Sequence, residues 1–314
     1  MIKLTLRQMQ YFETLVQTLH FGRAAVLCGI SQPALSAQIA DMEEKLGCKL
    51  FDRSGRNAIL TPEALTLLPL IARALAATRD VEEAAMAGRK ALEGRFRLGI
   101  IPTVAPYLLP SVLPQLRQRY PDLRLELREA VTDTLAEETA LGSLDAFIAA
   151  LPLDQPGLTA EALFEDRFFL AVPRAEPDLV APPVPPESPV LERLMLLEEG
   201  HCLRDQALQL CGSVRPTAMA NYGATSLTTL LQMVGHGFGV TLVPEMAVAP
   251  TAALPDLRVV PFTEPMPSRT VALAWRRNGH RQAECKALAQ VLKSVREEPT
   301  HVHQVSSSSQ VAVS

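Results

Sequence analysis

The amino-acid sequence predicts a mixed fold: an N-terminal winged helix-turn-helix, a long linker helix, and then an α/β region. Apolar residues recur with helical spacing over residues 6–46, and a short segment with the character of a hairpin follows at residues 50–60. Another helical pattern starts at Pro62, and from Arg95 onward apolar strands alternate with amphipathic helices. This alternation is typical of α/β folds.

Length and composition narrow the class of protein. With 314 residues the chain can form two or three domains, and 48% hydrophobic against 20% charged residues indicates a soluble globular protein. The N-terminus lacks an export signal and no apolar run is long enough to span a membrane, so we expect a cytoplasmic protein. Five cysteines do not suggest a secreted disulfide framework, and in the cytoplasm a disulfide would be transient.

Three short helices are predicted in the first 46 residues. Apolar residues with a helical period extend over residues 6–19, and a second helix of small residues over 21–28 ends at a glycine. Ser31 is a good N-cap for a third helix over residues 32–46, in which Pro33 is tolerated in the first turn. One face of this third helix is apolar and should point to the core: Leu35, Ile39, Met42 and Leu46.

The opposite face of the third helix fits the major groove of DNA. Glutamine can read adenine there, and hydroxyl groups can bind phosphates or base edges. The hairpin after this helix has the character of a wing, whose arginines would approach phosphates or the minor groove. The first 60 residues hold seven basic and five acidic residues, a modest excess, so a helical packing module stays open as the alternative. The predicted DNA-binding residues are Ser31, Gln32, Pro33, Ser36, Arg53 and Arg56.

A long helix is predicted from Pro62 to about residue 88, with this proline in its first turn. An apolar stripe along the helix would pair with a second helix. Pro69 departs from this pattern, because proline inside a helix costs about 3 kcal/mol or kinks it. We therefore expect a bend or a local break at Pro69. The stripe consists of Leu65, Leu68, Ala72, Leu75 and Ala76.

The α/β region starts with strands over residues 96–101, 123–127 and 144–151, separated by helices over 103–119 and 132–141. This order predicts a mostly parallel sheet, and residues 168–172 are expected to begin a second unit of the same kind. Six prolines between residues 177 and 189 predict an irregular surface loop. Later elements are a strand near 217–221, a helix from Ser226, strands over 239–243 and 270–275, and a helix over 282–295 that buries Cys285.

Two cysteines lie nine positions apart in the second half of the chain, at Cys202 and Cys211. The first stands among His201, Arg204 and Asp205, and cationic neighbours favour the reactive thiolate form of a cysteine. A helix is predicted to begin just after Cys202, and a helix N-terminus also stabilises an anion. These features predict a reactive thiol at Cys202, with Cys211 as its resolving partner.

The spacing of the two cysteines predicts a coupling between oxidation and shape. If the segment between them is helical in the reduced protein, the two α-carbons lie on the order of 13 Å apart. A disulfide needs about 4.4–6.8 Å, so closing it would require the helix to unwind. A sensor needs such a shape change, but the spacing is equally compatible with two unrelated core cysteines.

Four motifs in the first 60 residues are specific: Phe21-Gly-Arg-Ala-Ala, Ile30-Ser-Gln-Pro-Ala-Leu-Ser-Ala-Gln-Ile, Glu43-Glu-Lys-Leu-Gly and Leu50-Phe-Asp-Arg. Together they resemble the N-terminal signature of LysR-type transcriptional regulators. The resemblance implies a dimerising linker helix and a periplasmic-binding-protein-like effector domain of two α/β subdomains, with the late strand returning to the first. It also implies dimers or tetramers on paired DNA half-sites. The corresponding division is residues 1–60, 61–90 and 91–298, with a disordered tail over 299–314.

Two effector segments resemble the peroxide-sensing OxyR group of this family: Gly99-Ile-Ile-Pro-Thr-Val-Ala-Pro-Tyr-Leu-Leu-Pro, and Glu199-Gly-His-Cys-Leu-Arg-Asp-Gln-Ala with Cys211 following. The resemblance implies that Cys202 is the peroxidatic thiol and Cys211 the resolving one. It also implies that five further side chains surround the peroxide: Thr103, Thr132, His201, Asp205 and Arg269. Each threonine stands at a predicted helix start, so an N-capping role is compatible with the same position.

The function that the resemblance implies is transcriptional regulation of oxidative-stress defence, switched by a reversible Cys202–Cys211 disulfide. The implied partners are promoter DNA, hydrogen peroxide, RNA polymerase, a reducing glutaredoxin or thioredoxin, and further copies of the chain in a dimer of dimers. No enzymatic turnover, cofactor, metal or membrane association is expected. Two alternatives stay open: a metabolite-responsive regulator with inert cysteines, and a thiol peroxidase.

Overall fold

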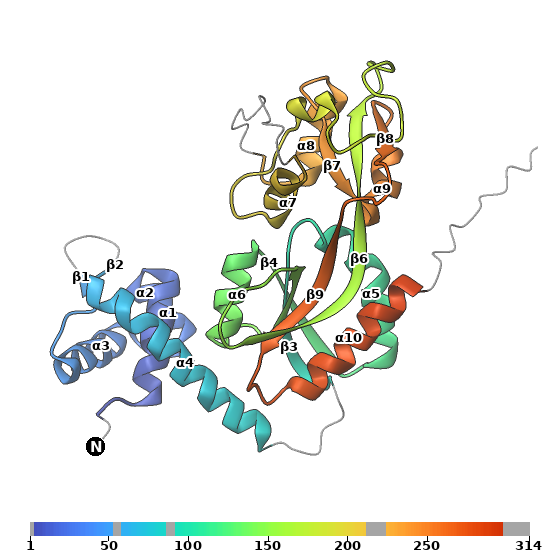
Figure 1. The fold of residues 1–314 in the computed structure, drawn as a ribbon. Coiled ribbons are helices and arrows are strands. Elements are labelled where there is room, and N and C mark those ends of the chain that lie inside the picture. The colour runs from blue at the N-terminus through green and yellow to red at the C-terminus, as the bar shows by residue number, and fades with distance from the viewer. Residues whose placement is uncertain (1–2, 53–57, 86–91, 212–223, 298–314) are drawn as a thin grey trace, which may run out of the picture.

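The computed structural model describes residues 3–52, 58–85, 92–211 and 224–297. Figure 1 shows three parts in chain order: a small N-terminal module, one long helix, and an α/β region built as two stacked subdomains. This arrangement confirms the mixed fold that the sequence predicts. None of the helices in these residues is long and apolar enough to cross a membrane.

The N-terminal module consists of α1 (Leu6–Thr18), α2 (Phe21–Leu27), α3 (Gln32–Leu46) and an antiparallel hairpin of β1 (Phe51–Asp52) and β2 (Ile59–Leu60). The side chain of Ser31 accepts a hydrogen bond from the Ala34 amide and caps α3, and Gly47 ends this helix with a φ of 72°. The predicted helix-turn-helix and hairpin are therefore confirmed. Its three helices share one buried core, which includes Phe12, Leu15, Ala24, Leu35, Ile39 and Met42.

The long helix α4 (Pro62–Ala84) continues through Pro69, so it is not broken there, and the bend expected as the alternative stays a prediction. The amide that Pro69 lacks would have bonded the carbonyl of Leu65. Leu65 is 57% exposed, so this turn of the helix faces solvent. Water can therefore donate a hydrogen bond to the carbonyl of Leu65 in place of the missing amide.

The predicted pairing stripe on α4 is also partly wrong. Leu75 lies in the core of the N-terminal module, and Ala72 and Ala76 are buried within the same chain, whereas Leu65 is exposed. Helical periodicity predicts that a face is apolar, but it does not predict which surface covers that face.

The first α/β subdomain has a parallel sheet at its centre. Its strands β3 (Gly94–Ile100), β4 (Leu123–Glu129) and β5 (Ala146–Ala150) lie in the order β4-β3-β5, with α5 (Ala105–Arg119) and α6 (Thr132–Ala140) as the crossovers. β9 (Ser268–Arg276) then pairs antiparallel with β5, and α10 (Gln282–Glu297) packs on the same core. The expected return of the late strand to the first subdomain is thus confirmed.

The second α/β subdomain departs from the predicted parallel unit. β6 (Leu158–Pro173) pairs antiparallel with β9, β7 (Thr241–Pro244) and β8 (Leu257–Pro261). An apolar run predicts a buried strand but carries no information on its direction, which explains the error. Around this sheet lie the 3-10 helix η1 (Pro189–Arg193), α7 (Cys202–Cys211), α8 (Leu227–Gly235) and α9 (Glu245–Ala252). Neither α9 nor β8 was expected, and the predicted strand near 217–221 lies outside the described residues.

Candidate functional site

Cys202 is the first residue of α7 and lies between the two α/β subdomains. Its helix belongs to the second subdomain, but its side chain packs against the core of the first. The thiol is free and partly buried. It borders a polar cleft of about 230 Å³ at the edge where the parallel strands end. The cleft is lined by Thr132, Asp133, Ala150, Leu151, Pro152, Gly200, Cys202, Asp205, Gln206 and Gln209.

Two polar atoms on the wall of this cleft are buried without a hydrogen-bond partner in the described part of the chain. They are Oγ1 of Thr132 and Oε1 of Gln206. Thr132 is the first residue of α6, so free amide groups of that helix lie close to it as well. Buried polar groups are rarely left unpaired, so these two atoms favour a cleft that holds a small polar molecule beside the thiol.

Arg269 and Thr103 form a second polar cluster, in which their side chains bond each other directly. Arg269 Nη1 donates to Thr103 Oγ1 over 2.9 Å, and Nη2 donates to the Thr103 carbonyl over 3.1 Å. Both side chains are buried, and neither belongs to the lining of the cleft around Cys202. Of the five predicted peroxide residues, Thr132 and Asp205 therefore line the cleft with Cys202, Thr103 and Arg269 lie in the second cluster, and His201 is in neither group.

Asp166 completes the second cluster and was missed from the sequence. It accepts hydrogen bonds from Arg269 Nε over 3.0 Å and from the Met246 amide over 3.1 Å, and its side chain is fully buried. The sequence carries no local signal for its role, because the same strand also holds Glu161, Glu165 and Arg167. Asp166 thus ties Arg269 to α9 of the second subdomain.

The cationic surroundings expected for Cys202 are only partly present. Burial lowers the pKa of His201, although the nearby Glu198 works in the opposite direction, so the imidazole is neutral at pH 7. The guanidinium of Arg204 donates to the carbonyl of Leu197 over 3.0 Å. Cys202 itself stands at the N-terminus of α7, where the first amide groups of a helix have no partner within the helix.

The buried His201 predicts a dependence of stability on pH. Because its pKa is lowered in the folded state, the unfolded chain binds the proton more readily as the pH falls below 6.5. Stability is fully present above this value and declines below it, by at most about 1.4 kcal/mol per pH unit. Urea unfolding at a series of pH values below 6.5 measures this decline. The unfolding free energy should fall less steeply with decreasing pH in His201→Gln than in the wild type. The same substitution at the exposed His236 is the control, and an unchanged slope for His201→Gln would contradict the expectation.

Helix α7 begins at one of the two cysteines and ends at the other. The predicted helix is confirmed as Cys202–Cys211, although the side chain of Cys211 lies outside the described residues. Nine helical steps separate the α-carbons by about 13 Å. A disulfide between these residues is therefore incompatible with an intact α7.

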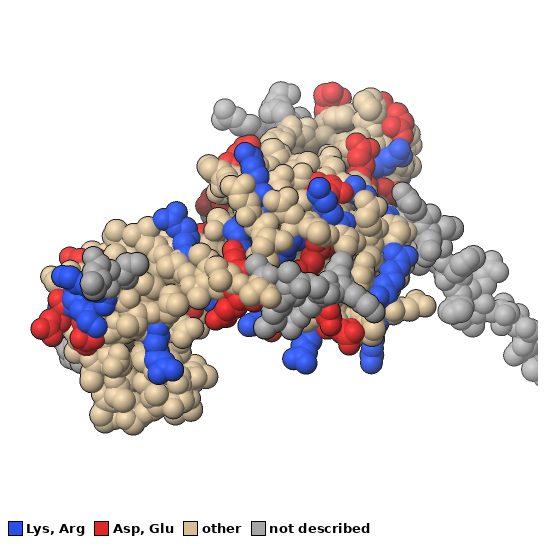
Figure 2. Space-filling view, turned by 90° about the horizontal axis from the view of Figure 1, so that it is seen from below, with Lys and Arg blue, Asp and Glu red and all other residues tan. Residues whose placement is uncertain are grey.

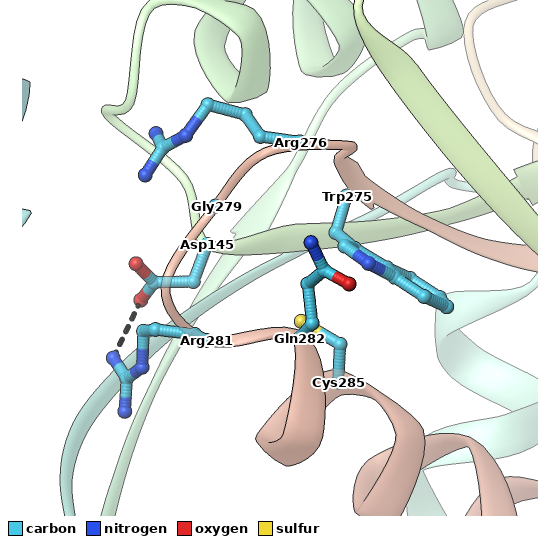
Figure 3. Close-up of a pocket in the computed structure, with 7 residues that line it drawn as sticks. All are labelled: Asp145, Trp275, Arg276, Gly279, Arg281, Gln282 and Cys285. Carbon is cyan, nitrogen blue, oxygen red and sulfur yellow. Dashed lines mark hydrogen bonds and ion pairs between the residues drawn. The ribbon is translucent and has the colours of Figure 1, made fainter.

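The three other cysteines fit structural roles, as expected. Cys285 is 1% exposed, and burial raises the pKa of its thiol to about 12. It borders a cavity of about 10 Å³ beside Trp275 and Gln282, which has room for one water molecule (Figure 3). Cys28 and Cys48 pack against the core of the N-terminal module.

The predicted DNA-binding residues lie on the surface of the N-terminal module where they are described. Gln32 and Pro33 are exposed at the start of α3, and Ser36 is partly buried. The Ser31 side chain caps α3, so its hydroxyl already has one partner. Arg53 and Arg56 lie outside the described residues. In the view of Figure 2, Lys and Arg stand singly among Asp and Glu, in line with the modest basic excess.

Comparisons with known proteins agree with this arrangement of a helix-turn-helix and a two-part α/β region. Residues 6–65 match the bacterial regulatory helix-turn-helix protein model of the LysR family, and residues 89–297 match the LysR substrate binding domain. The regulator OxyR of Escherichia coli K12 is 34% identical over 93% of this chain and 95% of its own length. A probable hydrogen peroxide-inducible genes activator of Streptomyces viridosporus is 39% identical over 95% of this chain and 96% of its own.

Solved structures give the same picture. A full-length OxyR variant from Pseudomonas aeruginosa superposes with a TM-score of 0.75 at 34% identity, covering 92% of this chain and 97% of that one. A hydrogen-peroxide-bound OxyR mutant from Corynebacterium glutamicum has a TM-score of 0.63 at 34% identity, covering 94% of both chains. The chain therefore belongs to the LysR family of bacterial helix-turn-helix regulators and, within it, to the OxyR group.

Proposed function

We propose that this protein is a transcriptional regulator that senses hydrogen peroxide at Cys202 and controls genes of oxidative-stress defence. The observation that carries the proposal is the thiol at the N-terminus of α7, beside a cleft whose buried Thr132 hydroxyl lacks a partner in the described chain. The names of the relatives, which are hydrogen peroxide-inducible genes activators, support the same function.

The proposed chemistry begins with attack of the Cys202 thiolate on the nearer oxygen of the peroxide. The O–O bond breaks, the departing oxygen leaves as hydroxide and takes up a proton to become water, and Cys202 becomes a sulfenic acid. Thr132 and Asp205 would hold the peroxide from the cleft, and neutral His201 can exchange a proton. Arg269 and Thr103 would stabilise the departing oxygen from the second cluster.

Cys211 completes the proposed reaction as the resolving thiol. Its sulfur attacks the sulfur of the sulfenic acid, a second water leaves, and the Cys202–Cys211 disulfide forms. Since an intact α7 holds the two α-carbons too far apart, the helix has to unwind before the bond closes. The peroxide signal is thereby converted into a change of backbone structure.

A change in the helical stability of α7 should alter the rate of disulfide closure. Leu208 lies on α7, is only partly buried and does not line the cleft, so Leu208→Gly and Leu208→Ala form a matched pair that both remove its side chain. Glycine weakens a helix by about 1 kcal/mol relative to alanine, which predicts closure about fivefold faster in the glycine variant. Mass spectrometry of quenched samples separates this step from sulfenic acid formation, which should proceed equally in both variants. Equal closure rates would show that unwinding does not limit the reaction.

The remaining partners follow from this role. Promoter DNA would be read by Ser31, Gln32, Pro33 and Ser36 of the N-terminal module, with Arg53 and Arg56 on the wing. RNA polymerase would receive the signal, and a glutaredoxin or thioredoxin in the cytoplasm would reduce the disulfide again. We expect a homo-oligomer, with a dimer of dimers spanning paired half-sites. One disulfide per stimulus suffices for such a sensor, so no enzymatic turnover is proposed.

Footprinting of promoter DNA with and without peroxide, combined with titration of thiols, tests this function in the full-length chain. Stoichiometric peroxide should remove the pair of thiols and change the protected region. A footprint that ignores peroxide but responds to a small carboxylate would instead favour a metabolite-responsive regulator. Continuous peroxide consumption in the presence of a reductant would favour a thiol peroxidase.

A further inference from the structure

The C-terminal half of α4 docks on the base of the first α/β subdomain. Ala76 and Asp80 of α4 meet Gly142, Arg276 and His280 of the subdomain, and we call these five residues the linker dock. Ala76 is only 5% exposed. The dock lies at the opposite end of the subdomain from α7, as Figure 1 shows.

Gly142 allows the two backbones to approach closely at the dock. Its φ of 80° is a conformation that favours glycine. A Cβ atom at this position would overlap the Cβ of Ala76 and lie 2.5 Å from Nη1 of Arg276. The subdomain therefore has a surface shaped to receive the helix, where any larger side chain would hold α4 away.

An ion pair and a neighbouring imidazole fix the position of α4 along this surface. Arg276 Nη2 lies 3.1 Å from Asp80 Oδ1, and His280 Nδ1 lies 3.2 Å from the same oxygen. Arg276 also donates from Nη1 to the carbonyl of Thr139 over 3.4 Å. Figure 3 shows Arg276 and its neighbour Trp275 projecting away from each other at the end of β9.

Two elements run from the cleft region to the linker dock. α6 begins at Thr132, on the wall of the cleft, and its last turn and the following residues carry Thr139 and Gly142 of the dock region. β9 begins next to Arg269 in the second polar cluster and ends at Arg276. A helix and a strand are stiff, so a displacement at one end is carried to the other.

The same helix also belongs to the N-terminal module. Ile71 and Leu75 are buried in the core of that module, together with residues of α1 and α3. Because one helix joins the core of the module to the dock, a movement at the dock changes the position of the whole helix-turn-helix.

We propose that the linker dock transmits the redox state of Cys202 to the DNA-binding module through α6, β9 and α4. The inference rests on the proposed peroxide-sensing function and adds the route of its regulation. A rearranged α7 moves the cleft ends of α6 and β9, the dock surface shifts against Ala76 and Asp80, and α4 reorients the helix-turn-helix on the promoter.

Neighbouring alanines on α4 provide a matched test in the full-length protein. Ala76→Glu places a charge in the dock and should detach the helix, whereas Ala77→Glu makes the same change at an exposed position. Both variants should form the disulfide with peroxide as the wild type does, measured by mass spectrometry. Peroxide-dependent promoter activity, taken as the ratio with and without peroxide, should fall to unity in Ala76→Glu and persist in Ala77→Glu.

A charge exchange gives a second test should Ala76→Glu fail to fold. Asp80→Arg should abolish the peroxide response, and the double variant Asp80→Arg/Arg276→Asp should restore it in part. A wild-type response in Ala76→Glu or Asp80→Arg, with Cys202 oxidised, would overturn the role of the dock and leave peroxide sensing intact. Absence of peroxide-dependent disulfide in the wild type would overturn the proposed function and the inference together.

Discussion

Replacement of Cys202 by serine is expected to abolish both the oxidation of the protein by peroxide and its effect on promoter DNA. Serine is similar in size to cysteine and keeps its place at the start of α7. Its hydroxyl stays protonated near neutral pH, so it does not attack peroxide as a thiolate does. Thiol titration of the variant should therefore give the same number of free thiols before and after treatment with stoichiometric peroxide. Footprints of the variant with and without peroxide should be identical.

The matched control for this variant is Cys48→Ser. Cys48 packs against the core of the N-terminal module and lies outside the cleft, so its removal should leave the peroxide response at the wild-type level. A Cys202→Ser protein that still changes its footprint with peroxide would transfer the sensing role to another residue. A Cys48→Ser protein that folds but loses the peroxide response would likewise contradict the assignment of sensing to Cys202.

Replacement of Asp166 by alanine is expected to give the largest loss of stability. The carboxylate and the guanidinium of Arg269 are fully buried and lie 2.9 Å apart, so the variant leaves a buried charge without its partner. Such a change costs about 3–5 kcal/mol of unfolding free energy. Urea unfolding of the full-length chain, compared with the wild type at the same pH, measures the loss.

An exposed ion pair and a double variant control this experiment. Arg95 and Glu126 lie 2.7 Å apart with more than half of each side chain exposed, so Glu126→Ala should cost no more than about 1 kcal/mol. Asp166→Ala/Arg269→Met removes the stranded charge and should recover part of the loss. An Asp166→Ala protein as stable as Glu126→Ala would show that the cluster is not the buried ion pair described above.

Local chemistry made much of the fold predictable. The N-cap at Ser31 and the apolar spacing of α3 depend only on neighbours in the chain, and both are found as expected. The same holds for the crossovers of the parallel sheet and for α7, whose helical pattern correctly placed two cysteines at opposite ends of one helix. The resemblance to the OxyR group then identified candidate site residues, such as Thr103 and Arg269, that lie far apart in the sequence and that no local pattern links.

The errors concern contacts between distant segments. The antiparallel pairing of β6 and the burial of Ala76 depend on surfaces that fold back from far along the chain. Asp166 is an ordinary acidic residue until Arg269, more than a hundred positions later, lies against it. His201 was expected to supply positive charge, but burial, which the sequence does not report, keeps it neutral.

Strand β6 has a mechanical consequence for the way this protein responds. Residues 158–167 of β6 pair with β9 in the first subdomain, and its last residues, 168–173, pair with β7 and β8 in the second. A single continuous strand therefore belongs to the sheets of both subdomains. Any movement of one subdomain against the other therefore has to bend or twist β6 near residues 167 and 168, where its pairing passes from β9 to β7 and β8.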